Sequence, residues 1–194
     1  MPTSPFKTNL RKKLKQVRDS LPIDPCVSTA VIDNLNSWMT GQNYSIVGFY
    51  LPIFHEVDLA PFMATWLEKN PGKKAAIPVI ENSQMFFAEW SPETKLTKGI
   101  FNTLVPQTIR KITPDLLLIP CLGFDNSNYR LGYGGGWYDR YLSQTNPGPF
   151  TVGIAYSQCR IETIEPEETD IPLDLIITDE FRSYSKRRKL MLIR

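Results

Sequence analysis

Histidine and cysteine are scarce in this chain of 194 residues, and their scarcity excludes several kinds of chemistry. His55 is the only histidine, so a metal site with several histidine ligands is excluded and a Ser-His-Asp triad is disfavoured. The three cysteines, Cys26, Cys121 and Cys159, lie far apart and form no CxxC or other metal-binding spacing. We expect buried free thiols in a reducing compartment. Any chemistry then falls to carboxylates, lysines, arginines and the backbone.

Long apolar runs and a strong charge of one sign are also absent. No stretch approaches the ~18 apolar residues of a membrane span, and no apolar segment follows the charged N-terminus as in a secretory signal. We therefore expect a cytoplasmic protein with no membrane partner. The length suits a single domain over residues 1–194, and we expect a monomer.

Basic residues gather near the two ends, although the formal net charge is only +2. The two segments are "KTNLRKKLKQVR", residues 7–18, and "RSYSKRRKLMLIR", residues 182–194. A solvated face or tail is the ordinary explanation of such runs, and nucleic-acid binding is the alternative.

The apolar pattern predicts alternating helices and strands. Ser4-Pro5 and Asp24-Pro25 are typical helix starts, and a third helix is expected after Asp58. Runs rich in β-branched and aromatic residues predict strands at "SIVGFYL", "KKAAIPV", "MFFAEW", "DLLLIP", "TVGIAY" and "DLIIT". This alternation favours an α/β fold: a single three-layer domain with a mostly parallel central sheet flanked by helices, and a ligand crevice at the strand ends.

The stretch "RLGYGGGWYDRYL", residues 130–142, contains three consecutive glycines between aromatic residues. It does not match GxGxxG, because Trp137 stands where the last glycine is required, and the chain has no Walker A motif. Bare amides just before a helix start are suited to bind phosphate, while Arg130 can grip it and Asp139 can hold the accompanying Mg²⁺. The pieces indicate a nucleotide-phosphate site, with a tight structural turn as the alternative for the glycines.

The longer block "PCLGFDNSNYRLGYGGGWYDRYL" resembles the signature of the 5-formyltetrahydrofolate cyclo-ligase family, also called methenyltetrahydrofolate synthetases. "KTNLR", "FYLPIFHEVDL" and "ETDIPLDLIIT" are similar to further segments of that family, so the resemblance covers nearly the whole chain. It implies an enzyme that converts 5-formyltetrahydrofolate and ATP, with Mg²⁺, to 5,10-methenyltetrahydrofolate, ADP and phosphate. ATP would phosphorylate the formyl oxygen, and N10 would then displace the phosphate.

The resemblance also implies roles for individual residues. Arg130 and Tyr138 would be catalytic, Asp139 and Asp170 would bind Mg²⁺, and Leu51 and Glu56 would contact the folate. The residues expected to bind ATP are Lys7, Arg11, Arg130, Gly132, Tyr133, Gly134, Gly135, Gly136, Trp137 and Tyr138. Four of these, Gly135, Gly136, Trp137 and Tyr138, would also contact the folate.

Several alternatives stay open at this point. Lys7 and Arg11 are four residues apart and would share one helix face, which could equally be a solvated face. Glu56, taken alone, would be an ordinary surface residue. Phe87 and Trp90 could stack on the pterin or pack in the core.

The sequence also departs from the family in places. Thr169 stands where relatives often have histidine, and Trp137 replaces a common tyrosine. An acidic residue that often precedes the proline of the middle segment is missing from "FNTLVPQ". Two rival functions are another enzyme on a related α/β scaffold, such as a sugar-phosphate isomerase or CoA-transferase relative, and a nucleic-acid-binding protein that uses its basic ends. The glycine block argues against both, so we expect no nucleic-acid partner.

Overall fold

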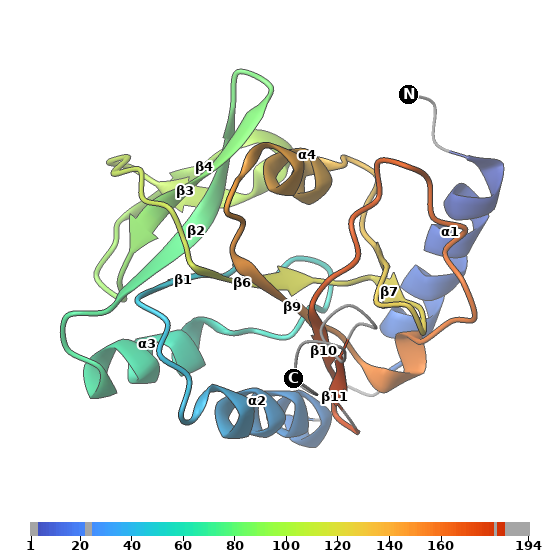
Figure 1. The fold of residues 1–194 in the computed structure, drawn as a ribbon, viewed down its shortest axis with the longest axis horizontal. Coiled ribbons are helices and arrows are strands. Elements are labelled where there is room, and N and C mark those ends of the chain that lie inside the picture. The colour runs from blue at the N-terminus through green and yellow to red at the C-terminus, as the bar shows by residue number, and fades with distance from the viewer. Residues whose placement is uncertain (1–3, 22–24, 181, 185–194) are drawn as a thin grey trace.

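The computed structural model describes residues 4–21, 25–180 and 182–184 (Figure 1). The predicted helix start at Asp24 and most of the basic segment 182–194 lie outside these residues.

A mixed seven-stranded sheet forms the centre of the described molecule. The strand order is β11-β10-β9-β6-β1-β2-β3, in which the five inner strands run parallel and the edge strands β3 and β11 are antiparallel to their neighbours. The strands are β1 Ile46–Gly48, β2 Lys74–Glu81, β3 Gln84–Trp90, β6 Leu116–Pro120, β9 Phe150–Ile154, β10 Leu175–Ile177 and β11 Arg182–Tyr184.

Helices cover both faces of this sheet, as the α/β prediction requires (Figure 1). Leu116 and Leu118 of β6 pack in the core cluster that contains α2 and α3, whereas Leu117 and Ile119 pack in the cluster that contacts α4. Alternating residues of β6 therefore pack in two different cores, one on each face of the sheet. Because both faces of the strand are buried, its sequence is a continuous apolar run. The helices are α1 Pro5–Ser20, α2 Pro25–Met39, α3 Ala60–Lys69 and α4 Trp137–Gln144.

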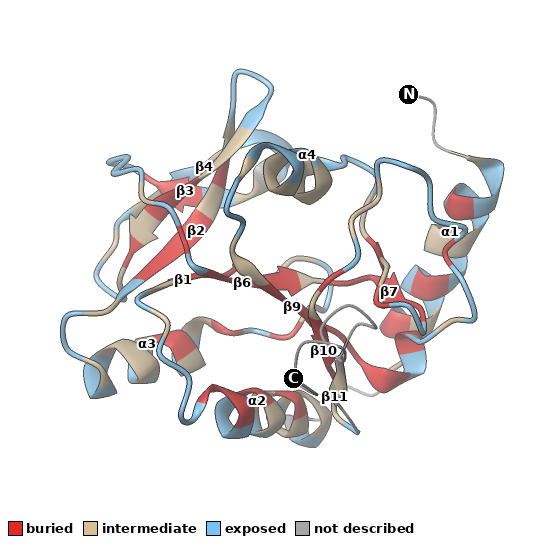
Figure 2. Cartoon of the chain, in the orientation of Figure 1, coloured by how far each residue is buried: buried red, intermediate tan, exposed pale blue. Residues whose placement is uncertain are grey.

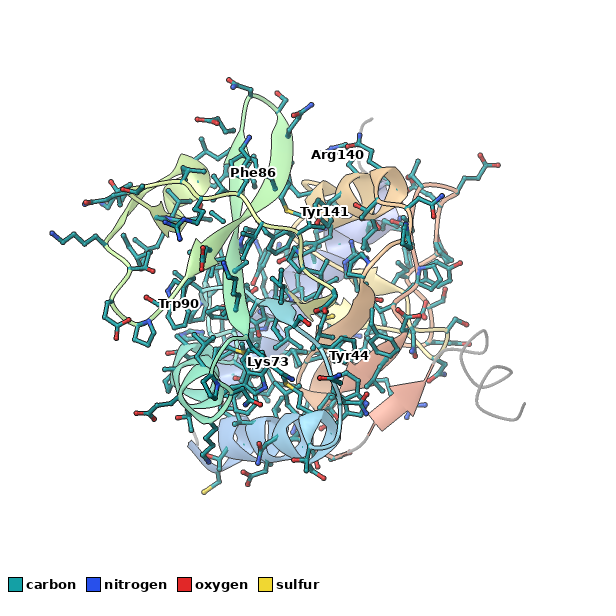
Figure 3. The ribbon with its side chains drawn as sticks, turned by 60° about the vertical axis from the view of Figure 1, so that its left-hand side comes forward. Tyr44, Lys73, Phe86, Trp90, Arg140 and Tyr141 are labelled. Atoms are coloured by element: carbon teal, nitrogen blue, oxygen red, sulfur yellow. The ribbon has the colours of Figure 1, made fainter. Side chains whose placement is uncertain are left out.

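The cores lie where the strands meet the helices (Figure 2). Phe87 and Trp90 of β3 belong to these cores: Phe87 packs edge-on against Tyr141 of α4, and Trp90 packs edge-on against Phe49. Figure 3 shows Trp90 on β3 and Tyr141 on α4. Neither Phe87 nor Trp90 lines the cavity described below, so core packing is their role.

Smaller elements complete the described chain. β4 Leu96–Lys98 pairs with β5 Leu104–Pro106 around the 3-10 helix η1 Ile100–Asn102, and η2 Ser157–Cys159 follows β9. β7 Gly123–Phe124 and β8 Arg130–Leu131 form the hairpin that leads into the glycine run.

Two local predictions need correction. Cys26 is exposed, so only Cys121 and Cys159 are buried thiols. The strand predicted over "SIVGFYL" ends at Gly48, because the chain then leaves the sheet while Phe49 and Tyr50 stay buried.

Candidate active site

A cavity of about 770 Å³ opens at the carboxyl ends of β1, β2 and β6. β2 lies on one side of β1 and β6 on the other, so the chain reverses its direction of travel across the sheet between β1 and β6. Parallel sheets bind ligands at such switch points, because the loops that follow the two strands separate there. Tyr50 and Leu51 after β1 and Pro120 at the end of β6 line this cavity.

Helix α1 directs a row of cations toward the cavity. Its start is capped by the Ser4 side chain, which accepts a hydrogen bond from the backbone N–H of Lys7 at 3.3 Å. Lys7 is only 5% exposed and donates to Asp170 Oδ2 at 2.6 Å, with Glu167 Oε1 at 3.1 Å. Arg11 donates from Nε to the carbonyl of Gly132 at 2.8 Å. The solvated-face interpretation is therefore wrong for Lys7.

Arg18 continues this row, and the sequence interpretation missed it. It lies seven residues after Arg11 on the same helix face, is 3% exposed, and donates from Nη1 to the Tyr133 hydroxyl at 2.9 Å and from Nη2 to the Cys121 carbonyl. From Lys7 to Arg18 the row spans roughly 16 Å at 1.5 Å per residue. The spacing of Lys7, Arg11 and Arg18 was the available signal, but exposed lysines at positions 12, 13 and 15 obscured it.

Three of the four glycines between Leu131 and Trp137 are required, for two different reasons. Gly134 and Gly136 have φ of 101° and 61°, a left-handed conformation that favours glycine. A Cβ on Gly135 would lie 2.5 Å from Nε1 of Trp137. Gly132 has open space around it. The tight-turn alternative is thus confirmed at two positions, while Gly135 allows the close approach of an indole ring.

The same loop leaves its amides available. Within the described part of the chain, the N–H groups of Gly134, Gly135 and Gly136 donate no hydrogen bond, and all three glycines line the cavity next to the first turn of α4. Such amides at a helix start form a site for an anion.

Arg130 is held beside this loop by two contacts. Its Nη2 lies 2.9 Å from Asp139 Oδ2, and its Nη1 donates to the carbonyl of Ile171 at 3.2 Å. Asp139 Oδ1 accepts from the Ile171 N–H at 3.1 Å. The guanidinium also lies over the ring of Tyr138. Arg130, Tyr138 and Asp139, predicted from one motif, are therefore assembled around the backbone of a distant segment.

Asp170 lies at the Lys7 end of the cavity. Its Oδ2 accepts from Lys7 and from the Glu167 N–H at 2.7 Å, while its Oδ1 accepts no hydrogen bond from the described residues. The two predicted metal ligands, Asp139 and Asp170, both line the cavity. The described residues contain no group of three or more His, Cys, Asp or Glu side chains arranged to hold a metal ion.

Glu56 is presented by a strained turn that the sequence did not predict. Phe54 and His55 both have positive φ, 46° and 59°, a conformation that histidine adopts at times but that is uncommon for a bulky residue such as Phe54. The turn closes with Glu56 N–H donating to the Ile53 carbonyl at 3.1 Å, and Glu56 Oε2 accepts from the Ile53 N–H at 2.9 Å. The carboxylate points inward, with its side chain 3% exposed. The surface interpretation of Glu56 is wrong.

Three buried polar atoms near this turn lack hydrogen-bond partners among the described residues. They are Glu56 Oε1, the Tyr50 hydroxyl and Arg18 Nε. Burial raises the pKa of Glu56 to about 7, although the Ile53 N–H, the charge of Arg18 and the Tyr133 hydroxyl oppose the rise. Burial also raises the pKa of Tyr50 well above its ordinary value. Buried groups without partners are costly, so this end is built to receive hydrogen bonds from a ligand.

The aromatic residues of the glycine loop form part of the cavity wall. Burial raises the pKa values of Tyr133 and Tyr138, so both phenols are neutral at pH 7. The Trp137 indole stacks under the guanidinium of Arg140 at 4.3 Å from its centroid. Figure 3 shows Arg140 on the outer side of α4. Leu51 and Thr169 also line the cavity.

In the described part of the chain, no helix has the length and apolarity needed to cross a membrane. The family model of the 5-formyltetrahydrofolate cyclo-ligase family matches residues 3–179. The 5-formyltetrahydrofolate cyclo-ligase of Mycoplasma pneumoniae is 37% identical over 177 residues, which cover 90% of this chain and 99% of that protein. The Escherichia coli K12 enzyme of the same name is 30% identical, over 68% of this chain and 76% of its own.

A solved structure supports the same relationship. The NMR structure of the 5,10-methenyltetrahydrofolate synthetase of Aquifex aeolicus matches with a TM-score of 0.80 and 30% identity, covering 93% of each chain. The α/β fold is thus that of a ligase of folate metabolism. The chain belongs to the 5-formyltetrahydrofolate cyclo-ligase family.

Proposed function

We propose that this enzyme closes 5-formyltetrahydrofolate to 5,10-methenyltetrahydrofolate at the expense of ATP, with ADP and phosphate as the other products. The observation that carries the proposal is the polarity of the cavity. Lys7, Arg11 and Arg130 line it together with the bare amides of the glycine loop, and so do Glu56 and Tyr50, whose Oε1 and hydroxyl have no hydrogen-bond partner among the described residues. Cations and amides suit a polyphosphate, whereas buried acceptors suit the N–H groups of a pterin.

The ATP end would work by neutralising and orienting phosphate. Lys7 and Arg11 bring charge from α1, and the loop from Gly132 to Trp137 supplies amides. Arg130 would bind the transferred phosphoryl group, and Tyr138, neutral beneath it, would shape the site around the formyl oxygen. Phosphoryl transfer of this kind depends mainly on positioning and charge stabilisation.

The folate end would orient the formyl group toward that phosphate. The Glu56 carboxylate is suited to accept two N–H bonds from the amino-amide edge of the pterin, and Leu51 and Trp137 offer apolar and aromatic contact. An amide oxygen is a poor leaving group, so its phosphorylation allows N10 to attack the formyl carbon and phosphate to depart. The closed ring keeps the carbon, and the phosphate carries away the oxygen.

The carboxylates fit a Mg²⁺ that binds together with the nucleotide. Asp170 Oδ1 has no hydrogen-bond partner among the described residues, and Asp139 faces the same cavity. Mg²⁺ in nucleotide enzymes is commonly held by one or two carboxylates plus phosphate oxygens and water, so a full protein cage is not needed. Asp139 and Asp170 would hold the ion, which would supply charge neutralisation at the phosphates.

The test is to mix purified protein with 5-formyltetrahydrofolate, ATP and Mg²⁺ and to follow the absorbance of the methenyl product. We expect product only when nucleotide and divalent metal are both present. Equal product formation after nucleotide removal and chelation would contradict the phosphorylation mechanism. No product under any condition would contradict the proposed reaction.

A further inference from the structure

We propose that Arg18 is a positioning residue for the folate ligand: it keeps Glu56 charged and Tyr133 in place while leaving Glu56 Oε1 free to accept hydrogen bonds. This inference rests on the proposed function, in which Glu56 binds the folate. It concerns a residue that does not itself line the cavity, so Arg18 acts through Glu56 and Tyr133.

Arg18 donates its hydrogen bonds to Tyr133 and Cys121, whereas its charge acts on Glu56. Nη1 donates to the Tyr133 hydroxyl and Nη2 donates to the Cys121 carbonyl. Nη1 lies 3.9 Å from Glu56 Oε1, which is too long for a hydrogen bond but close enough for a strong electrostatic attraction. The guanidinium therefore stabilises the carboxylate without occupying its acceptor oxygen.

A purely structural salt bridge would be built differently. Burying an arginine and a glutamate is costly, and the cost is recovered only when direct hydrogen bonds satisfy both groups. Here Glu56 Oε1 and Arg18 Nε have no hydrogen-bond partner among the described residues. The Arg18–Glu56 pair therefore contributes little to the stability of the fold, and Glu56 Oε1 stays able to accept a hydrogen bond from a ligand.

Among the described residues, Arg18 supplies the cation that acts on the Glu56 pKa. Four further titratable groups interact electrostatically with Glu56: Tyr50 from the β1 loop, Tyr133 from the glycine loop, Tyr138 from α4 and Cys121 from the end of β6. Because the Glu56 pKa is already about 7, loss of the Arg18 charge would leave the carboxyl mostly protonated at neutral pH.

The experiment measures kcat and KM for 5-formyltetrahydrofolate across the pH range around the Glu56 pKa. In Arg18→Gln, we expect the folate KM at neutral pH to rise about tenfold, with a smaller change in kcat, and the acidic limb of kcat/KM to move upward by about 1 to 3 pH units. In Arg18→Lys, which keeps the charge, the limb should stay near the wild-type position. Lys12→Gln removes a charge from the exposed side of the same helix and should leave the profile unchanged.

A double-mutant cycle separates the charge role from packing. Adding Arg18→Gln to Glu56→Gln should raise the folate KM little further, since the group that Arg18 acts on is gone. Fully additive losses, or an Arg18→Gln profile with an unmoved acidic limb, would overturn the proposal. If Arg18→Gln fails to fold, Arg18→Lys decides: a limb displaced despite the retained charge overturns it. Absence of wild-type turnover would instead reject the proposed function.

Discussion

The two ends of the cavity differ in whether their polar side chains have partners within the protein. At the end that we propose to bind ATP, called the phosphate end below, the charges are paired: Lys7 with Asp170 at 2.6 Å and Arg130 with Asp139 at 2.9 Å. At the end that we propose to bind the folate, called the folate end, Glu56 Oε1 and the Tyr50 hydroxyl have no hydrogen bond from the described residues.

This difference indicates how each end meets its ligand. A charged ligand such as ATP must rearrange existing ion pairs, and a metal ion that takes over the carboxylates would release Lys7 and Arg130 for the phosphates. At the folate end no hydrogen bond to these atoms has to be broken, because Glu56 Oε1 and the Tyr50 hydroxyl are buried without a hydrogen-bond partner among the described residues. Unsatisfied groups held ready in this way are common at functional sites.

The largest effect is expected from Arg130→Gln, which removes the guanidinium from the phosphate end. We expect kcat/KM to fall by about 100-fold or more, because charge stabilisation of the transferred group is lost. Arg110→Gln is the matched control, since Arg110 is exposed and pairs only with Glu89. Steady-state kinetics of both variants check this. A loss of Arg130→Gln activity no greater than that of the control would remove Arg130 from the reaction.

Gly135→Val tests whether the glycine loop belongs to the phosphate end. A side chain there would displace the Trp137 indole and narrow the loop, so we expect Mg-ATP affinity to fall by about tenfold or more. Gly148→Ala is the control, because Gly148 does not line the cavity and a Cβ there would meet only the Thr145 carbonyl oxygen, at 3.4 Å. Calorimetric titration with Mg-ATP distinguishes them. Unchanged affinity in Gly135→Val would leave the loop as a structural turn, as would a large fall in melting temperature without ligand.

Glu56→Gln tests how much stability the fold loses when the buried Glu56 carboxyl group ionises. The folded-state pKa of about 7 lies above the ordinary 4.5, so the carboxyl group weakens the fold as pH rises between these values. The full penalty above pH 7 is on the order of 3 kcal/mol. Relative to wild type, the melting temperature of Glu56→Gln should therefore rise with pH across this window, while folate affinity falls. A melting-temperature difference that does not vary with pH would show that Glu56 carries no such penalty.

Asp139→Asn and Asp170→Asn should produce the smallest change. We expect each variant to need several-fold more Mg²⁺ for half-maximal activity, as a weaker ligand replaces a carboxylate that works together with phosphate oxygens. Circular dichroism would check that the fold is kept. Wild-type metal dependence in both variants would make these carboxylates partners of Arg130 and Lys7 only.

The sequence predicted the phosphate end better than the folate end, for a physical reason. Arg130, Asp139 and the glycines are close in sequence, and their local pattern indicates an anion site. Helical spacing placed Lys7 and Arg11 on one face of α1, and the family resemblance, not the spacing, gave them a role with ATP. The alternation of strands and helices likewise predicted the layered sheet.

The folate end depends on tertiary contacts that no local pattern contains. The turn at Phe54 and His55 has positive φ without glycine or asparagine, so its inward presentation of Glu56 gave no signal. Arg18 differs from the exposed Lys12, Lys13 and Lys15 only in the direction that α1 packs. The burial of Tyr50 follows from the early end of β1 at Gly48, which the strand pattern also missed.

In the proposed mechanism one cavity holds both ligands at once, at opposite ends. Simultaneous binding is tested most directly by calorimetric titration of 5-formyltetrahydrofolate into protein saturated with Mg²⁺ and a non-hydrolysable ATP analogue. We expect one folate bound per chain, with affinity equal to or tighter than that for the protein alone. Folate affinity that falls steadily as the analogue concentration is raised would show instead that the two ligands compete for one position.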